Sequence, residues 1–286
     1  MTIATVVIPC LNAATTLRPV LKALNEQGIR HQLEVVVVDN GSADDTVRIA
    51  SSLAERVLVE SRPGSYAARN RGLWECDTEF IFSVDSDCRP RSRCWAERHL
   101  AALQAAPTDV LATAAPLIPE PSVDWWSQRD DVTPQPGVDA YGTVMYPVGG
   151  NRCSRTDLLR TLGGFPAFRA DDAALGRRAL RAGLRFIWVP DATAYHRNPS
   201  GLRGYHRQMR KAAQYATELD GPVPPRSVHV WAMRRITRAT LGVGKRVLRG
   251  QLREGLAFAV KVDAQIRGAM DIWAEPRSES SEEMQG

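Results

Sequence analysis

The sequence predicts an α/β protein in which helices flank a mostly parallel sheet, followed by a helical C-terminal appendage. Continuous apolar runs rich in β-branched residues, such as residues 2–9 and 32–39, are typical of strands buried on both faces of a parallel sheet. Each run is followed by turn residues and then by a segment with apolar residues at helical spacing. Strands and helices that alternate in this way indicate right-handed crossovers and helices on both faces of the sheet.

In the N-terminal part, strands are predicted at residues 2–9, 32–39 and 56–60 and in the run that ends at Asp85. Helices are predicted between them. The first follows Thr16 as an N-cap, the second starts from a capping-box-like pair, Ser42 and Asp45, and the third begins at about Tyr66. Short connections marked by glycine and proline separate these elements, as expected for a series of βαβ units.

The second part continues with further predicted elements. These are a helix at 92–106, a strand at 109–115, a helix with Ser154 as N-cap that stops at Gly163 and Gly164, and a strand at 184–189. Residues 116–147 show only weak periodicity, and loops of this length in compact domains are usually functional or disordered. Its aromatic residues argue against disorder. These aromatic residues either line an acceptor site or pack over the sheet. They are Trp125, Trp126, Tyr141 and Tyr146.

Composition places the chain among soluble globular proteins, with 24% charged residues and a net charge of +5 over 286 residues. The 5 cysteines are odd in number and scattered, without a CxxC pair, which predicts reduced thiols in a cytoplasmic protein. We expect no secretory leader, because the chain opens directly on a strand-like segment. The sequence also contains no apolar run of about eighteen residues, so we expect no membrane-spanning helix.

Polar residues follow the predicted strands where each strand ends. These clusters lie at residues 9–12, 39–42 and 85–87. The carboxyl ends of parallel strands share one edge of the sheet, and this edge is where open α/β sheets bind ligands. Asp85 and Asp87 form an Asp-x-Asp pair, whose oxygens suit Mg²⁺ or Mn²⁺ carrying a phosphorylated substrate. Taken singly, a strand-ending aspartate such as Asp39 is more often a turn or cap residue.

An ordered set of motifs resembles a known family. The segments VVIPCLNAATTL, VVVVDNGSADDT, ARNRGL and FSVDSDCRP are similar to the family 2 inverting glycosyltransferases, which use nucleotide-diphosphate sugars. The resemblance covers roughly residues 3 to 200 and implies a GT-A fold, with a Rossmann-like, mostly parallel sheet. It also implies dependence on Mn²⁺ or Mg²⁺.

The resemblance assigns roles in donor binding to the first motifs. Asp39 would accept a hydrogen bond from the nucleobase, with Pro9, Leu11 and Asn12 forming the floor beside it. Asn40 stands where the family's DDGS motif usually has a second aspartate, and Gly41 follows it.

The remaining donor-side roles fall on residues further along the chain. Arg69 would lie near the nucleotide, and Asp85, with Ser86 beside it, would contact the ribose or the sugar. Asp87 would hold the divalent cation across the diphosphate. Such a cation stabilises the charge that develops on a departing diphosphate without any proton transfer.

A second segment, with Asp171 and Asp172, resembles the family's EDxDLxxRL motif at the start of a helix. By this match Asp172 is the catalytic base, which would deprotonate the acceptor hydroxyl. Asp171 takes the glutamate position and is expected to do no more than stabilise the helix N-terminus, whereas Ala174 replaces the later aspartate and leaves the acceptor open. The resemblance also places His196 where several GT-A enzymes have a histidine that joins the cation or the diphosphate; a structural role for this residue is equally expected.

The predicted organisation has three parts. Residues 1–221 form the catalytic domain, with a nucleotide-sugar half up to about residue 115 and an acceptor half after it. Residues 222–274 form a basic amphipathic helical appendage, which would bind an anionic membrane surface, form a homodimer or pack on the catalytic domain. Residues 275–286 are rich in serine and glutamate and are expected to be disordered.

The predicted function is metal-dependent, inverting transfer of a sugar from a nucleotide-diphosphate sugar to a hydroxyl acceptor. A UDP-sugar is the commonest donor in such enzymes, and a GDP- or dTDP-sugar remains open, as does an acceptor that is a glycan, a lipid-linked group or a small molecule. One alternative is a catalytically silent sugar-nucleotide-binding or membrane-associated scaffold. A lesser one is a nucleotidyltransferase, although PCLNAATTL lacks the Gly- and Arg-rich loop that binds a triphosphate. No module that reads nucleic acid is recognisable, and we expect a cytoplasmic protein, with peripheral attachment to the inner membrane face as an option.

Overall fold

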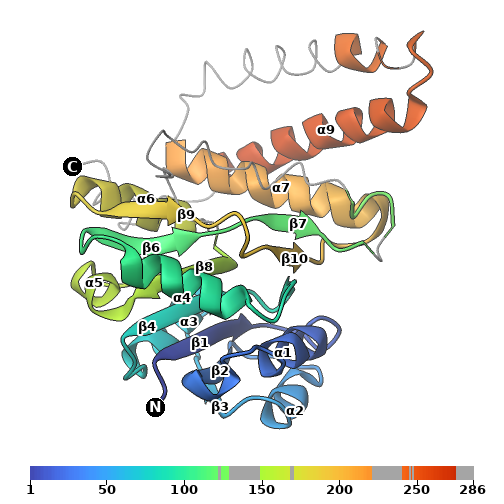
Figure 1. Ribbon diagram of the computed structural model, residues 1–286. Helices are drawn as coiled ribbons and strands as arrows, with labels where there is room; N and C mark the ends of the chain where they lie inside the picture. The colour runs from blue at the N-terminus through green and yellow to red at the C-terminus, as the bar shows by residue number, and fades with distance from the viewer. Residues whose placement is uncertain are drawn as a thin grey trace. The chain divides into compact units, whose positions relative to one another are not determined.

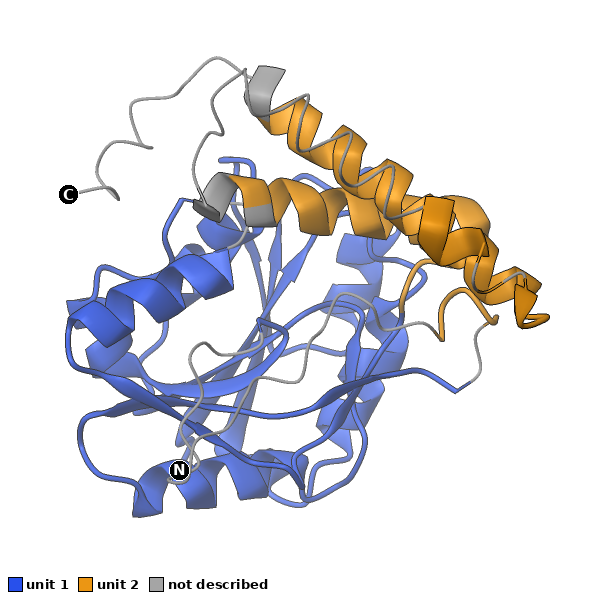
Figure 2. Cartoon of the chain, turned by 90° about the horizontal axis from the view of Figure 1, so that it is seen from above, with its two compact units in different colours: residues 1–121, 133–197 blue, residues 122–132, 198–286 orange. Residues whose placement is uncertain are grey.

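The computed structural model describes residues 1–121, 124–128, 149–167, 171–220, 240–244, 246 and 248–274. The chain divides into two compact units, which Figure 2 shows in different colours. Unit 1 contains residues 1–121 and 133–197, and unit 2 contains residues 122–132 and 198–286. Tyr141 and Tyr146, which were predicted to line an acceptor site or pack over the sheet, lie outside the described residues. The tail at 275–286, predicted to be disordered, also lies outside them.

Unit 1 is built on a seven-stranded sheet with the order β3-β2-β1-β4-β8-β6-β9 (Figure 1). Its strands are β1 (Ala4–Cys10), β2 (Leu33–Asp39), β3 (Arg56–Val59), β4 (Phe80–Val84), β6 (Val110–Ala114), β8 (Asn151–Arg155) and β9 (Arg185–Trp188). Strands β3, β2, β1 and β4 pair in parallel, and so do β6 and β9. Only β8 runs antiparallel to both of its neighbours, so the mostly parallel sheet predicted from the sequence is confirmed.

Helices follow the strands in the predicted alternation. They are α1 (Leu17–Asn25), the short 3₁₀ helix η1 (Arg30–Gln32), α2 (Thr46–Ser51), α3 (Ser65–Trp74), α4 (Trp95–Ala105), α5 (Thr156–Thr161) and α6 (Asp171–Arg181). A small second sheet, ordered β5-β10-β7, consists of β5 (Cys88–Pro90), β7 (Leu117–Pro119) and β10 (Ala194–His196). In this sheet β10 runs antiparallel to β5 and parallel to β7.

The core of unit 1 lies on both faces of the large sheet, because successive strand residues point to opposite faces. Val35 and Val37 of β2 belong to one apolar cluster with residues of α1 and α4, whereas Val36 and Val38 belong to the other with residues of α3 and α6. This division explains why β2 reads as a continuous apolar run rather than an alternating one. Gly72 brings α3 close to the sheet, since a Cβ atom there would lie 2.4 Å from Cγ1 of Val7.

Helix termini were predicted with mixed success. The stop after α5 is confirmed, because Gly163 and Gly164 adopt positive φ angles of 83° and 74° and donate to the carbonyls of Arg160 and Leu159. Ser154 is not an N-cap: it lies within β8, opposite Ile81 of β4. An isolated serine before a helical pattern does not reveal that its backbone is paired in a sheet.

The capping box predicted at Ser42 and Asp45 is wrong. Asp45 occupies the N-cap position of α2 without a side-chain cap, and Asp44 instead accepts the backbone N–H of Thr46 at 3.0 Å. Ser42 is used elsewhere, as the acceptor for the backbone N–H of Asn12. Thr16 is at the N-cap position of α1, as predicted, but its hydroxyl donates to the carbonyl of Ala13 rather than capping the helix.

Unit 2 contains the helices α7 (Gly201–Asp220) and α9 (Leu252–Ala274). They run in the same direction, because His206 pairs with Asp263 and Arg210 with Asp271 further along both helices. Gly268 allows close approach, since a Cβ atom there would lie 2.3 Å from the carbonyl oxygen of Arg210. Within the described residues, neither helix is apolar enough over a sufficient length to cross a bilayer.

The aromatic pair of unit 2, Trp125 and Trp126, packs within this unit. The two rings meet edge to face at 4.8 Å, and Trp126 lies 5.6 Å from the ring of Tyr205. Both tryptophans lie against a small apolar cluster that contains Tyr205 and Met209 of α7 and Ala257 and Ala264 of α9. Of the two roles left open for these aromatics, packing therefore accounts for the contacts of this pair.

Candidate functional site

The ends of the parallel strands bring the predicted polar clusters to one edge of the large sheet. Cys10 at the end of β1 lies opposite Asp39 at the end of β2, and the backbone N–H of Asn40 donates to the Cys10 carbonyl at 2.8 Å. At the end of β4, Val84 lies opposite Asn151 of β8. The segments at residues 9–12, 39–42, 85–87 and 149–151 therefore meet at the edge that binds ligands in open α/β sheets.

The loops after β1 and β2 hold each other in place. Buried Asp39 accepts the backbone N–H groups of Gly41 and Ser42 at 3.1 and 3.2 Å, which makes it a turn residue as well as a candidate ligand. Asn12 has a positive φ of 53° and accepts the backbone N–H of Ala43 through its side-chain oxygen at 2.9 Å. Leu11 between Pro9 and Asn12 is 58% exposed, so an apolar surface stands beside Asp39 at the strand ends.

Asn40 fastens the loop that follows β3. Its side-chain Nδ2 donates to the carbonyls of Glu60 and Arg62, each at 2.7 Å, and its Oδ1 accepts the backbone N–H of Gly64 at 2.9 Å. A carboxylate could accept from Gly64 but could not donate to the two carbonyls. The structure thus gives a physical reason for asparagine at this position of the motif.

Arg69 connects three segments at the site. This buried guanidinium bonds to Asp85 after β4 at 2.5 Å and to Asp171, the first residue of α6. Burial alone would lower the pKa of Arg69, but the charges of Asp171 and Asp85 outweigh it, and the pKa is raised. Asp171 therefore does more than stabilise a helix terminus, contrary to the prediction, because it lies buried against a cation from α3.

Asp172 and Asp85 lie on either side of two glycines. The backbone N–H of Gly149 donates to Oδ2 of Asp172 at 3.2 Å, and a Cβ atom on Gly150 would lie 2.7 Å from Oδ2 of Asp85. Withdrawal from solvent and the charge of Asp171 raise the pKa of Asp172 above its ordinary value. A carboxylate with a raised pKa is suited to accept a proton.

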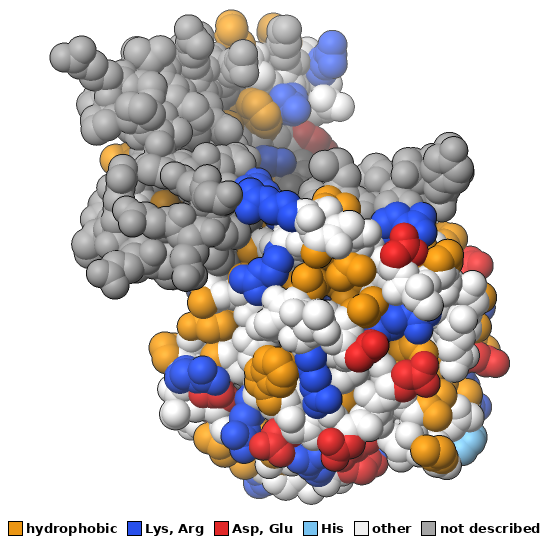
Figure 3. All heavy atoms as spheres, turned by 90° about the vertical axis from the view of Figure 1, so that its left-hand side faces the viewer, with side chains coloured by type: hydrophobic (Ala, Val, Ile, Leu, Met, Phe, Trp, Pro, Cys, Tyr) orange, Lys and Arg blue, Asp and Glu red, His pale blue; other side chains and the backbone are white. Residues whose placement is uncertain are grey.

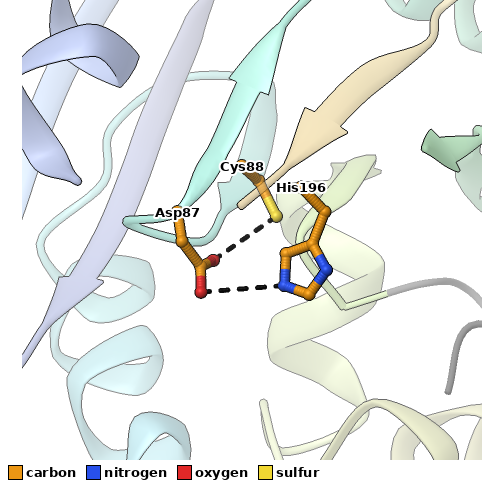
Figure 4. A group of neighbouring side chains, drawn as sticks. All are labelled: Asp87, Cys88 and His196. Carbon is orange, nitrogen blue, oxygen red and sulfur yellow. Dashed lines mark hydrogen bonds and ion pairs between the residues drawn. The ribbon is translucent and has the colours of Figure 1, made fainter. Parts of the chain in front are cut away.

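Asp87, Cys88 and His196 form a group of potential metal ligands (Figure 4). Asp87 lies in the turn between β4 and β5, and its Oδ2 is 3.6 Å from Nε2 of His196 in β10. The Cys88 thiol is 3.6 Å from Oδ1 of Asp87, and one ligand atom from each residue lies within 4.8 Å of the others. Burial would raise the pKa of Asp87, but His196 outweighs this effect and lowers it.

Ser86, between the two aspartates, opposes the rise that burial causes in the pKa of the Cys10 thiol. Burial, together with the charges of Asp39, Asp85 and Asp87, raises the pKa of that thiol. Cys10 is therefore a neutral core residue at the edge of the site, and Ser86 spaces the two carboxylates.

Sequence reasoning did not identify Cys88 or Arg152. Cys88 lies opposite His196 in the small sheet, which no local pattern reveals. Arg152 is a fully buried residue of β8 whose guanidinium lies 4.7 Å above the ring of Phe165. The sequence offers one signal for Arg152: it stands next to Cys153 in a stretch that could form a buried strand, where an arginine is unusual.

Charges elsewhere on the described surface are mixed. On the face drawn in Figure 3, acidic and basic side chains are interspersed among apolar ones over the coloured residues.

Comparison with known proteins identifies the family of the chain. The model of glycosyl transferase family 2 matches residues 5–182, and the model of glycosyl transferase family group 2 matches residues 122–262. The glycosyltransferase AglE of Haloferax volcanii is 26% identical over 200 residues, which cover 67% of this chain and 66% of that protein. The pre-mycofactocin glycosyltransferase of Mycobacterium tuberculosis is 32% identical over 223 residues, but only 44% of its length is covered, against 70% of this chain.

Solved structures share the fold. The mannosyltransferase PcManGT from Pyrobaculum calidifontis, in complex with GDP-Man and Mn²⁺, has a TM-score of 0.65 at 23% identity over 95% of this chain and 87% of that one. TarS 1–349 of S. aureus, in complex with UDP-GlcNAc, has a TM-score of 0.56 at 18% identity over 94% and 91% of the two chains. The GT-A type fold predicted from the sequence is thereby confirmed. Because one family model spans more than half of the 286 residues, the chain belongs to glycosyl transferase family 2.

Proposed function

We propose that this protein is a metal-dependent, inverting glycosyltransferase that moves a sugar from a nucleotide-diphosphate sugar to a hydroxyl acceptor. One observation carries the proposal. Separate segments of a family 2 chain bring Asp39, Asp85 and Asp87 to the strand ends at one edge of the sheet in unit 1, and Gly149 and Gly150 lie between Asp85 and Asp172. Each of these acids has surroundings that suit a different task.

Donor binding is proposed for the loops after β1 and β2. Asp39 would accept a hydrogen bond from the nucleobase, and the exposed Leu11, with Pro9 and Asn12, would form the floor beside it. Asn40 and Gly41 keep this loop in shape through their backbone and side-chain hydrogen bonds. Because relatives of the same fold were solved with GDP-Man and with UDP-GlcNAc, we propose a nucleotide-diphosphate sugar as donor: a UDP-sugar first, with GDP- and dTDP-sugars as alternatives.

A divalent cation fits the group around Asp87. The carboxylate of Asp87 and the imidazole of His196 are donors that Mn²⁺ and Mg²⁺ accept, and they face each other at 3.6 Å. When bound, the cation would stabilise the charge that develops on the departing diphosphate. Asp85, anchored by Arg69, would contact the ribose or the sugar beside it.

Asp172 is the proposed base of the transfer step. Its carboxylate would take the proton of the acceptor hydroxyl while the hydroxyl oxygen forms a bond to the anomeric carbon. The bond from that carbon to the diphosphate oxygen would break on the opposite face, and the nucleoside diphosphate would leave with the electron pair. Attack opposite the leaving group inverts the configuration, and the raised pKa of Asp172 supports its role as base.

The test of the base assignment is Asp172→Asn. Sugar transfer should fall by about 10²- to 10⁴-fold, the usual contribution of a general base. Asp157→Asn is the matched control, since Asp157 is also in the first turn of a helix but is exposed. Transfer by Asp172→Asn within a few-fold of wild type would refute the assignment.

Binding must be measured together with activity, because a silent sugar-nucleotide-binding scaffold is the alternative. A thermal-shift panel of nucleoside diphosphates with and without Mn²⁺ reports binding, since a ligand of the native state raises the midpoint. Midpoint shifts without transfer to a panel of hydroxyl acceptors, and without hydrolysis of the sugar nucleotide, would favour the scaffold. The nucleotidyltransferase alternative would instead release pyrophosphate from a nucleoside triphosphate.

We also propose that unit 2 binds an anionic membrane surface at the inner face of the membrane. Leu252 and Leu256, one turn apart at the start of α9, are exposed, and Leu248 just before them is 89% exposed. The exposed Arg249 and Arg253 stand beside these leucines in the chain. Apolar side chains flanked by arginines match the boundary between acyl chains and anionic headgroups.

A further inference from the structure

Arg152 is a buried cation without an assigned task. Its side chain is 0% exposed, and Nε, Nη1 and Nη2 have no hydrogen-bond partner in the described part of the chain. The guanidinium lies 4.7 Å from the centre of the Phe165 ring. A buried guanidinium without hydrogen bonds destabilises a fold, so an apolar residue would serve strand β8 better if packing were its only purpose.

The pleat of β8 directs Arg152 toward the acids of the site. Its neighbour Asn151 is on the opposite face, where it accepts hydrogen bonds from Trp95 at 2.8 Å and His99 at 3.2 Å. Arg152 instead shares the Phe165 ring with Arg69, whose guanidinium is 5.9 Å from the ring centre. The two cations therefore lie in one layer, between the sheet and the helices α3 and α6.

All three acids of this layer attract Arg152, but Asp172 is the one that makes no direct bond to a cation among the described residues. The charged groups that face one another there are Arg69 from α3, Asp85 after β4, Arg152 from β8, and Asp171 and Asp172 from α6. Arg69 forms direct ion pairs with Asp85 and Asp171. The Asp172 carboxylate, in contrast, accepts the backbone N–H groups of Gly149 and Ala173 among the described residues.

We infer that Arg152 is a positioning residue for the proposed transfer reaction: its buried guanidinium is the counter-charge that keeps the Asp172 carboxylate ionised while Arg69 holds the other two acids. Gly149, whose backbone N–H donates to Asp172, lies two residues before β8 and three before Arg152, so one short segment carries both the hydrogen-bond donor and the cation. This inference rests on the proposed role of Asp172 as base.

The electrostatics agree with the geometry. Burial and Asp171 raise the pKa of Asp172, whereas Arg152 and then Arg69 lower it. Burial and the charge of Arg69 lower the pKa of Arg152 itself to about 10, so its guanidinium remains charged at neutral pH. Loss of this cation would let the opposing effects raise the pKa of Asp172 further, and the base would be protonated at a higher pH.

The experiment replaces Arg152 by methionine, which keeps the length and the contact with Phe165 but removes the charge. The ¹³C carboxylate resonance of Asp172, assigned by its loss in Asp172→Asn, is titrated in the free protein. In Arg152→Met its midpoint should rise by about one pH unit, and Arg152→Lys should restore the wild-type midpoint. If Arg152→Met does not fold, the titration midpoint of Asp172 is measured in Arg152→Gln, with the same rise expected.

A second readout is the pH dependence of kcat/KM for transfer. Its acidic limb should move to higher pH in Arg152→Met, and the rate should recover at alkaline pH. An unchanged Asp172 midpoint, or an equal loss of rate at every pH, would show that Arg152 only packs and would overturn the inference. The resonance is measured without substrate, so failure of the proposed transfer reaction would appear in the rates alone.

Discussion

Arg69 in α3 and Asp171 in α6 form a buried ion pair between residues that are 102 positions apart in the chain. The same guanidinium also binds Asp85, directly after β4. One cation thus joins two helices and a strand at the edge of the sheet where the proposed donor and base residues meet. The consequences of this arrangement, and of the other contacts at the site, can be measured.

Replacing Arg69 by methionine should destabilise the protein strongly. The change would leave Asp171 buried and Asp85 partly buried without their cation, and breaking a buried pair from one side costs about 3–5 kcal/mol. Urea unfolding measures the loss. Arg71→Met is the control, because Arg71 makes an exposed i,i+4 pair with Glu75 at 3.0 Å that is worth about 0.5 kcal/mol. Equal losses in the two variants would contradict a special role for Arg69.

Restoring the family's usual acid with Asn40→Asp should weaken this protein. The carboxylate cannot donate to the carbonyls of Glu60 and Arg62, so the free energy of unfolding should fall by about 1–3 kcal/mol. Asn25→Asp is matched, since Asn25 donates to one carbonyl, that of Leu53, and its Oδ1 accepts from Arg30. In Asn25→Asp the new charge beside Arg30 should offset part of the loss of stability. A larger loss in Asn25→Asp than in Asn40→Asp would contradict the prediction.

Stability should depend on pH through His99. Burial lowers the pKa of His99 from its ordinary 6.5 to about 4, and the neutral ring bonds to Thr113 and Asn151. Between these values the unfolded chain binds the extra proton, so stability is fully present above pH 6.5 and declines as the pH falls toward 4. The decline from this group is about 3 kcal/mol.

The measurement is the free energy of urea unfolding at several pH values in that window. His99→Gln should flatten the slope, whereas His31→Gln, at an exposed position, should leave it as in wild type. A slope that persists unchanged in His99→Gln would assign the pH dependence to other groups.

Asp87→Ala should impair cation binding. Titration of Mn²⁺ in the presence of a nucleoside diphosphate, followed by the electron paramagnetic resonance of free Mn²⁺, measures the affinity. We expect a loss of more than about tenfold, since even residues that only support metal ligands contribute that much. Asp45→Ala, which removes an exposed carboxylate paired with Arg48, should bind as wild type does. Normal Mn²⁺ binding by Asp87→Ala would exclude this residue as a ligand.

The double variant Leu248→Gln and Leu252→Gln should bind phosphatidylglycerol vesicles at least about tenfold more weakly in cosedimentation, because it removes two apolar side chains from the proposed contact. A control with Val59→Gln and Trp74→Gln changes two exposed apolar residues of unit 1. Phosphatidylcholine vesicles and added salt should weaken wild-type binding. Unaltered vesicle binding, with a change of oligomeric state in sedimentation velocity, would assign these leucines to a homodimer instead.

Much of unit 1 follows from local sequence. The β-branched runs of β1 and β2, and the apolar stripe of α1 at Leu17, Val20, Leu21 and Leu24, have periods that local backbone geometry imposes. The positions of Asp39, Asp85 and Asp87 follow in turn, because parallel strands present their carboxyl ends at one edge. Strand register and pairing do not follow from local sequence. The local pattern predicts a helix that begins at Ser154, but this residue lies in β8, which runs antiparallel between β4 and β6.

By itself, then, the sequence determined the α/β fold, the family and the acids at the strand ends, since periodicity, turn residues and motif order are properties of neighbouring residues. The tertiary structure decided which charges meet. Arg69 with Asp171, Cys88 with His196, and Arg152 buried above Phe165 are contacts between distant segments. They depend on strand register and on the burial of each group, and burial by the rest of the fold is what makes a charge costly, shifts its pKa and selects its partner.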